Sequence, residues 1–129
     1  MKILIIGLGS IGRKHVDGIL NHLPDALIYA LRSDNGEDLY RTVKNIYDKS
    51  EIPSDIDFVM ISNITAAHAD TILDMVQYNC PLFIEKPVLS NISKAEEISK
   101  QLKESGINSY VACNMRFYPA IVFIKNYLK

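Results

Sequence analysis

The sequence predicts an α/β domain in which a doubly wound, mostly parallel sheet carries helices on both faces. Short apolar stretches rich in β-branched residues alternate with longer stretches whose apolar residues recur at helical spacing. Such an alternation requires crossover connections, which place helices against both faces of a parallel sheet. The 129 residues, of which 48% are hydrophobic and 22% charged, have the size and composition of one ordinary globular domain.

Five stretches are predicted to be strands because they are short, apolar and bounded by turn-forming residues. They cover residues 2–6, 27–31, 57–62, 81–84 and 110–114. Residues 32–53 are the least regular part of the chain, because they are polar and too few for a full crossover helix. There we expect an abbreviated helix over residues 37–44 and a small strand near Ile46.

Four amphipathic stretches are predicted to be helices, and they cover residues 11–23, 66–78, 92–105 and 119–129. Pro24 ends the first of them, and Thr65 is placed to cap the second. In the third, Ser93 and Glu96 have the spacing of a capping box, and Gly106 stands at the C-terminal end.

Three glycines, Gly7, Gly9 and Gly12, follow the first predicted strand and open the first predicted helix in the pattern G-x-G-x-x-G. Gly7 permits a tight turn, Gly9 lets the backbone approach a pyrophosphate, and Gly12 lets helix and strand pack closely. The pyrophosphate would lie on the unpaired N–H groups of the helix start. This context predicts a Rossmann-type dinucleotide-binding fold. The alternatives are a glycine-rich turn without a ligand and a loop for a methyl-donor nucleotide.

The residues after the second predicted strand bear on which dinucleotide is bound. A cofactor without a 2′-phosphate favours a carboxylate there, for the ribose hydroxyls. This chain has Arg32 and Ser33, a guanidinium and a hydroxyl that suit a phosphate. The pattern favours NADP(H), and Asp34 keeps NAD(H) as the alternative. The interpretation without a ligand is that Arg32 is a solvated surface charge.

Two further stretches lie at the carboxyl ends of predicted strands, the edge at which open α/β sheets bind ligands. They are I-S-N-I-T-A-A-H (61–68) and F-I-E-K-P-V (83–88). Together with G-L-G-S-I-G-R-K-H, they resemble the N-terminal domain of the Gfo/Idh/MocA oxidoreductase family, over nearly the whole chain. The resemblance ends with C-N-M-R-F-Y-P-A (113–120), which looks like the family's stretch leading into its second domain. The motifs E-K-P and N-x-R-F-x-P argue against a methyl-donor domain.

The resemblance implies a set of contacts with a nicotinamide cofactor. The pyrophosphate would be wrapped by five residues of the glycine loop: Gly7, Gly9, Ser10, Ile11 and Gly12. The nicotinamide-side ribose and the adenine half would be flanked by Ser62, Asn63, Thr65 and His68. The cofactor amide would lie near Asn114 and Arg116.

The same resemblance places Glu85 and Lys86 against the nicotinamide ribose and the substrate. Lys86 is the catalytic candidate, because the matching lysine of relatives is implicated in substrate binding or proton transfer, and an ammonium group offers three donors. A cis peptide before Pro87 would aim it. The alternatives are that Lys86 is an ordinary surface lysine, that Glu85 is structural, and that His68 stabilises its own helix.

Two positions depart from the family pattern. Ile64 stands where the family usually has proline, and Arg32-Ser33 stands where it commonly has an acidic residue. The enzymes that the chain resembles are also two-domain proteins more than twice as long. Their second domain carries a catalytic histidine and its acidic partner, and it usually makes the oligomer interface. We therefore interpret residues 1–118 as the dinucleotide-binding domain and residues 119–129 as the start of a connection to a second domain.

For the full-length enzyme, the resemblance implies hydride transfer between nicotinamide and a secondary alcohol of a sugar, cyclitol or nucleotide-sugar, in a homo-oligomer. The isolated chain is expected to bind the dinucleotide with little or no turnover. A stand-alone dinucleotide-binding sensor without catalysis is the alternative, and a reading frame that stopped at Lys129 would favour it.

Composition disfavours several other classes of protein. A net charge of −1 without a basic stripe argues against nucleic acid or an anionic membrane as a partner. No apolar run approaches the ~20 residues of a membrane span. Cys80 and Cys113 lack metal-ligand spacing, so we expect no metal site and two buried thiols in a reducing cytoplasm. His15 and His22 are expected to be solvated.

Overall fold

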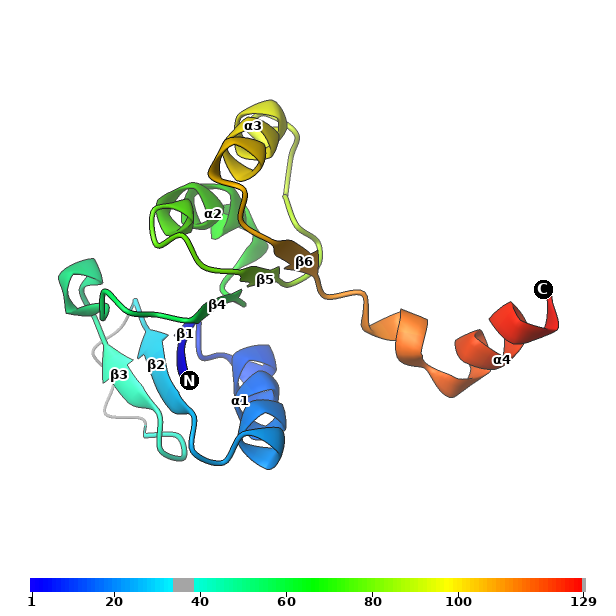
Figure 1. The fold of residues 1–129 in the computed structure, drawn as a ribbon, viewed down its shortest axis with the longest axis horizontal. Helices are drawn as coiled ribbons and strands as arrows, with labels where there is room; N and C mark the ends of the chain where they lie inside the picture. The colour runs from blue at the N-terminus through cyan, green and yellow to red at the C-terminus, as the bar shows by residue number, and fades with distance from the viewer. Residues whose placement is uncertain (34–38, 129) are drawn as a thin grey trace.

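A computed structural model describes residues 1–33 and 39–128 and confirms the doubly wound parallel sheet (Figure 1). In these residues the strands are β1 (Lys2–Ile6), β2 (Leu27–Leu31), β3 (Lys44–Ile46), β4 (Phe58–Ile61), β5 (Leu82–Ile84) and β6 (Ser109–Val111). Their order is β3-β2-β1-β4-β5-β6, and every neighbouring pair is parallel. The order reverses between β1 and β4, and open α/β sheets bind ligands at such a switch point.

The helices are α1 (Ser10–His22), α2 (His68–Val76), α3 (Ala95–Ser105) and α4 (Pro119–Tyr127), as far as the structure describes the chain. Short 3₁₀ turns cover Lys49–Glu51, Thr65–Ala67 and Asn114–Phe117. Figure 1 shows α1 on one side of the sheet and α2 with α3 on the other. The sheet therefore has helices on both faces, as the sequence predicts.

Alternating side chains of the strands feed two apolar clusters, one on each face of the sheet. In β1, Ile3 and Ile5 pack with Val16 of α1, whereas Leu4 packs with Ile72 of α2 on the opposite face. Because both faces are covered, the strand is apolar throughout rather than alternating. This burial holds the carboxyl ends of β1, β4 and β5 side by side, where the candidate site lies.

The expected helix over residues 37–44 is not present in the part of it that the structure describes. Residues 37 and 38 lie outside the described chain; residues 39–43 contain a turn, and Lys44 opens β3. Arg41 has a φ of +53°, in the left-handed region that interrupts a helix. The small strand near Ile46 is confirmed, because β3 pairs with β2 there.

Two predicted helix caps are wrong. Thr65 opens a 3₁₀ turn without capping, and α2 begins only at His68. The capping box of Ser93 and Glu96 does not form, since α3 begins at Ala95 with no side-chain cap. Instead, the Asn91 side chain accepts hydrogen bonds from the backbone N–H and the hydroxyl of Ser93. A local turn of this kind competes with helix initiation for the same donors.

The two cysteines differ in environment. Cys80 is buried in the core, as expected, and burial raises the pKa of its thiol. Cys113 is exposed, which corrects the expectation of two buried thiols. It lies just beyond β6, the last strand at that edge of the sheet.

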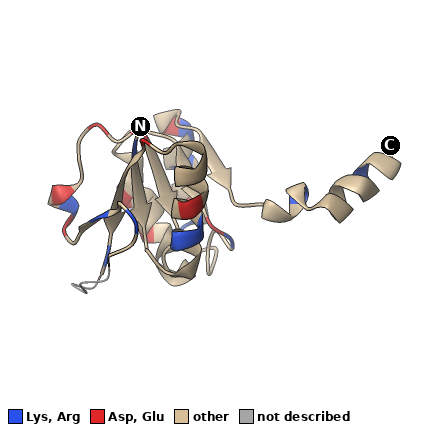
Figure 2. Ribbon diagram, turned by 90° about the horizontal axis from the view of Figure 1, so that it is seen from below, with Lys and Arg blue, Asp and Glu red and all other residues tan. Residues whose placement is uncertain are grey.

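Helix α4 projects away from the sheet at the C-terminal end (Figures 1 and 2). Pro119 occupies its first turn, and none of its residues is buried. Its exposed large apolar side chains are Ile121, Val122, Phe123, Ile124 and Tyr127. Figure 2 also shows acidic and basic segments interspersed over the rest of the ribbon. Within residues 1–33 and 39–128, no helix is both long and apolar enough to cross a bilayer.

Candidate functional site

The turn between β1 and α1 can form only with glycine at two of its three glycine positions. Gly7 has a φ of +89°, and a Cβ there would lie 2.6 Å from the Asn63 Cα. A Cβ on Gly12 would lie 2.3 Å from the Gly7 carbonyl oxygen. A Cβ on Gly9 would meet nothing within 4 Å. Gly7 and Gly12 therefore serve close packing, whereas Gly9 leaves open space above the backbone.

The N-terminus of α1 faces that open space with its donors uncapped. Gly9 is the N-cap and provides no side-chain oxygen, and the first turn contains no acidic residue. The first backbone bond of the helix runs from the Arg13 N–H to the Gly9 carbonyl, at 3.0 Å. The amides of the first turn thus have no partner within the helix, which makes this end suitable for an anion.

The hollow at this turn has a volume of about 620 Å³. Its lining contains most of the residues predicted for the phosphates and the adjoining ribose: Gly7, Gly9, Ser10, Ile11, Arg32, Ser33, Ser62 and Asn63. Leu8, Ile64 and Ala67 complete it. Gly12 lies beneath the turn rather than in this lining.

The loop after β4 forms the opposite wall of the hollow. The Ser62 hydroxyl donates to the Gly7 carbonyl at 2.8 Å and ties this loop to the glycine turn. The Asn63 amide nitrogen donates to the Thr71 hydroxyl at 2.9 Å. The Asn63 Oδ1 is buried without a hydrogen-bond partner among the described residues. An orphaned buried acceptor fits a ligand that brings hydroxyl donors, as a ribose does.

His68 lies beneath the site rather than in it. Its side chain is only 1% exposed. Its Nδ1 lies 3.0 Å from the Pro87 carbonyl and 3.2 Å from the Val88 carbonyl, and its Nε2 lies 3.1 Å from the Asn63 carbonyl. The ring therefore joins the loop after β4 to the loop after β5. Its place in the structure is that of a residue that holds both loops.

The E-K-P turn, formed by Glu85, Lys86 and Pro87, follows β5. The Glu85 N–H donates to the Ile61 carbonyl at 2.9 Å, which extends the pairing of β5 with β4. The Lys86–Pro87 peptide is cis, as predicted. Lys86 is exposed, and the Glu85 carboxylate accepts its backbone N–H at 3.1 Å. The Lys86 ammonium is thus accessible to a ligand at the carboxyl edge of the sheet.

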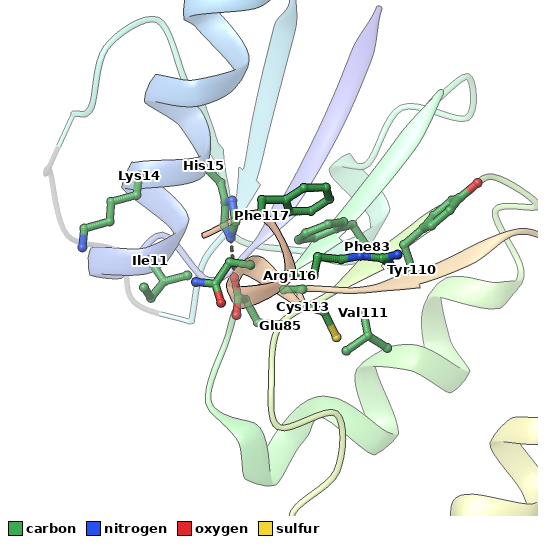
Figure 3. Close-up of a pocket in the computed structure, with 12 residues that line it drawn as sticks. Ile11, Lys14, His15, Phe83, Glu85, Tyr110, Val111, Cys113, Arg116 and Phe117 are labelled. Carbon is green, nitrogen blue, oxygen red and sulfur yellow. Dashed lines mark hydrogen bonds and ion pairs between the residues drawn. The ribbon is translucent and has the colours of Figure 1, made fainter. Parts of the chain in front are cut away.

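A second hollow of about 430 Å³ lies between α1 and the end of β6 (Figure 3). It brings together Glu85, Asn114 and Arg116 from two separate predictions, and Ile11 lines both this hollow and the first. The guanidinium of Arg116 lies 5.6 Å from the centroid of the Phe117 ring. Thr65, His68 and Lys86 line neither hollow.

Arg32 and Ser33 also line an adjoining hollow of about 550 Å³. The carboxylate of Asp48 lies in the same lining. Hydrogen bonds from the Ser50 hydroxyl and backbone N–H lower the pKa of Asp48, so this carboxylate is ionised at neutral pH. Asp34, the residue that kept NAD(H) as the alternative, lies outside the described residues.

Sequence reasoning missed His15. It was expected to be solvated, but its Nε2 lies 2.6 Å from the Glu85 Oε1, and its side chain is only 24% exposed. The signal was present in the helical spacing. His15 follows Ile11 by four residues and precedes Ile19 by four, so it lies on the stripe that faces the sheet. His22 is exposed, as expected.

Comparison with known proteins agrees with this geometry. Residues 1–112 match the family model described as oxidoreductase family, NAD-binding Rossmann fold. A scyllo-inositol 2-dehydrogenase (NAD(+)) of Bacillus subtilis is 26% identical over 93% of this chain and 37% of its own length. The uncharacterized oxidoreductase YrbE of the same organism is 30% identical over 94% of this chain and 38% of its own length. The chain thus spans less than two fifths of these relatives.

A solved structure with the same fold is that of a WlbA dehydrogenase from Chromobacterium violaceum, in complex with NADH and UDP-GlcNAcA. Its TM-score is 0.87 at 16% identity, over 98% of this chain and 39% of the other. At that identity the likeness concerns the fold.

Proposed function

Because this chain belongs to the Gfo/Idh/MocA family of oxidoreductases, we propose that it binds a nicotinamide dinucleotide in the hollow at the glycine turn. The observation that carries the proposal is the open space at Gly9, which adjoins the uncapped start of α1 and the orphaned oxygen of Asn63. Amides at a helix N-terminus suit a pyrophosphate, and an unpaired acceptor suits a ribose hydroxyl.

Within the whole protein, we propose that the domain serves hydride transfer to or from a secondary alcohol of a sugar, cyclitol or nucleotide-sugar. The names of the relatives support this class, since one is an inositol dehydrogenase. The dinucleotide supplies the hydride chemistry when bound, and the protein orients it. In the direction of reduction, the Lys86 ammonium would donate a hydrogen bond and then a proton to the substrate carbonyl oxygen. In the direction of oxidation, its neutral amine would accept the proton of the substrate hydroxyl. The side chain is exposed at the same edge of the sheet.

We also propose that Arg32 and Ser33 favour NADP(H) over NAD(H). Both residues line the hollow at the glycine turn and the hollow that adjoins it. A guanidinium and a hydroxyl there suit a phosphate monoester. The Asp48 carboxylate opposes this preference from the same hollow, although the Ser50 backbone N–H already occupies one of its oxygens at 2.8 Å.

The proposed phosphate site, here called the phosphate cradle, consists of Gly9 and the first turn of α1. Two glycines allow a matched test of it. Gly9 and Gly18 both lie at positions where a Cβ meets nothing within 4 Å, but only Gly9 lines the hollow. We expect Gly9→Ala to weaken NADH and NADPH at least about tenfold, or about 1.4 kcal/mol, because the methyl group occupies the place of the phosphates. Gly18→Ala should leave both affinities unchanged. Fluorescence titration measures the dissociation constants, and circular dichroism checks that both variants are folded.

The proposal fails if the unaltered chain binds neither dinucleotide at millimolar concentration. It fails equally if Gly9→Ala and Gly18→Ala bind both dinucleotides as the unaltered chain does.

A further inference from the structure

We infer that His15 is a positioning residue. Through its hydrogen bond to the Glu85 carboxylate, it helps to set the position of the E-K-P turn relative to the phosphate cradle. The inference rests on the proposed function, since that function gives the turn its role. Three observations carry it: the geometry of the His15–Glu85 contact, the use of the second carboxylate oxygen, and the position of His15 on α1.

The contact between His15 and Glu85 is short and sheltered (Figure 3). The His15 Nε2 lies 2.6 Å from the Glu85 Oε1, and the two side chains are 24% and 18% exposed. The ring packs edge-on against Phe83, with centroids 5.6 Å apart and planes at 75°. A charge-assisted hydrogen bond of this length, held by an aromatic neighbour, fixes the direction of the carboxylate.

The second oxygen of the same carboxylate organises the turn. The Glu85 Oε2 accepts the backbone N–H of Lys86 at 3.1 Å. Glu85 thereby connects the His15 ring on α1 to the backbone of the residue proposed to meet the substrate. With His15 on one oxygen and the Lys86 backbone N–H on the other, the carboxylate fixes the turn to the helix.

The position of His15 on α1 gives this connection its consequence. Gly9 caps α1 at the cradle, and His15 lies in the second turn of the same helix. Ile11, one turn before His15, lines both hollows. A single helix therefore presents its amides to the pyrophosphate of the proposed ligand and holds the turn that meets the nicotinamide end. The His15–Glu85 contact ties the turn to this helix, in addition to the pairing of β1, β4 and β5.

The test compares two ligands, NADH and ADP, which keeps two phosphates but lacks both the nicotinamide ring and its ribose. His15→Leu removes the donor, and His15→Gln places an amide nitrogen near the position of Nε2. We expect His15→Leu to weaken NADH at least about tenfold and to change ADP by less than about twofold, because only the nicotinamide ring and its ribose meet the turn. His15→Gln should restore most of the lost NADH affinity. A residue with only a structural role would weaken both ligands alike.

A second readout does not depend on any ligand. In the ¹H–¹⁵N spectrum of the unliganded chain, the Lys86 amide should shift in His15→Leu and in Glu85→Gln, and return toward its original place in His15→Gln. The inference is overturned if the Lys86 amide is unmoved in His15→Leu, or if that folded variant keeps the original ratio of NADH to ADP affinity. If the unaltered chain binds neither ligand while the amide shifts as expected, the proposed function fails and the positioning role stands.

Discussion

Arg32 follows directly after β2, and its backbone is fixed by a hydrogen bond from its N–H to the Ile46 carbonyl at 3.0 Å. The Arg32→Asp substitution replaces a cation by an anion in the lining of the hollow at the glycine turn and of the hollow that adjoins it. If Arg32 receives a 2′-phosphate, NADPH should lose about 1.5–3 kcal/mol of binding free energy, the range for hydrogen bonds to charged groups. NADH, which has only the hydroxyl there, should lose little. Titration of both reduced cofactors measures the difference.

A distant charge reversal provides the control for this substitution. Lys103 is exposed on α3 and lines neither of the hollows that Arg32 lines. Lys103→Asp therefore changes the net charge by the same amount without touching the site. Both affinities should stay the same in that variant. Equal losses of NADPH and NADH in Arg32→Asp would contradict the assignment of a 2′-phosphate to this side chain.

At the scale of residues, the positions of the motif residues were predictable, but the contacts that each of them makes were less so. The sequence placed Gly7, Gly9 and Gly12 correctly, since their context of strand and helix is local. That Gly7 packs against Asn63 depends on a loop more than fifty positions away in the chain. The contact of His15 with Glu85 also joins distant segments, so only the helical stripe of α1 hinted at it.

At the scale of elements, the strands and most helices were predictable because burial on both faces leaves a strong apolar signal. Helix ends were less predictable. The side chains of Asn91 and Ser93 bond to each other ahead of α3, and a 3₁₀ turn precedes α2. Such short-range competition is decided by small free-energy differences that a spacing rule does not contain. Asp48 and Glu51 instead form a capping box in the irregular segment.

The packing of α1 on β1 depends on Gly12. A Cβ there would lie 2.3 Å from the Gly7 carbonyl oxygen and 3.1 Å from the Ser62 Oγ, so helix and turn must separate. We expect Gly12→Ala to lower the free energy of unfolding by about 1–3 kcal/mol, as overpacking does. Gly18→Ala, in the same helix and in open space, should raise it by about 0.5–1 kcal/mol. Urea unfolding measures both, and stabilisation by Gly12→Ala would contradict the close packing.

At the scale of the whole molecule, the two faces of the sheet are covered unequally. Helices α2 and α3 pack over β4 and β5 on one face, whereas on the other α1 covers the middle of the sheet. Near β6 that face is open, and Tyr110, Val111 and Cys113 are exposed around the second hollow. No local pattern in the sequence predicts this asymmetry, because it depends on which elements the chain places there.

Helix α4 adds further apolar surface to this open end. It buries none of its residues, and Phe123 is 69% exposed. Because none of the described residues of α4 is buried, deletion of residues 119–129 should leave the thermal midpoint within about 2 °C, as expected for a change of less than about 0.5 kcal/mol. The deletion should also reduce self-association, since large exposed apolar patches promote it. Calorimetry and sedimentation velocity measure the two effects; a fall of several degrees would mean that α4 packs on the sheet in solution.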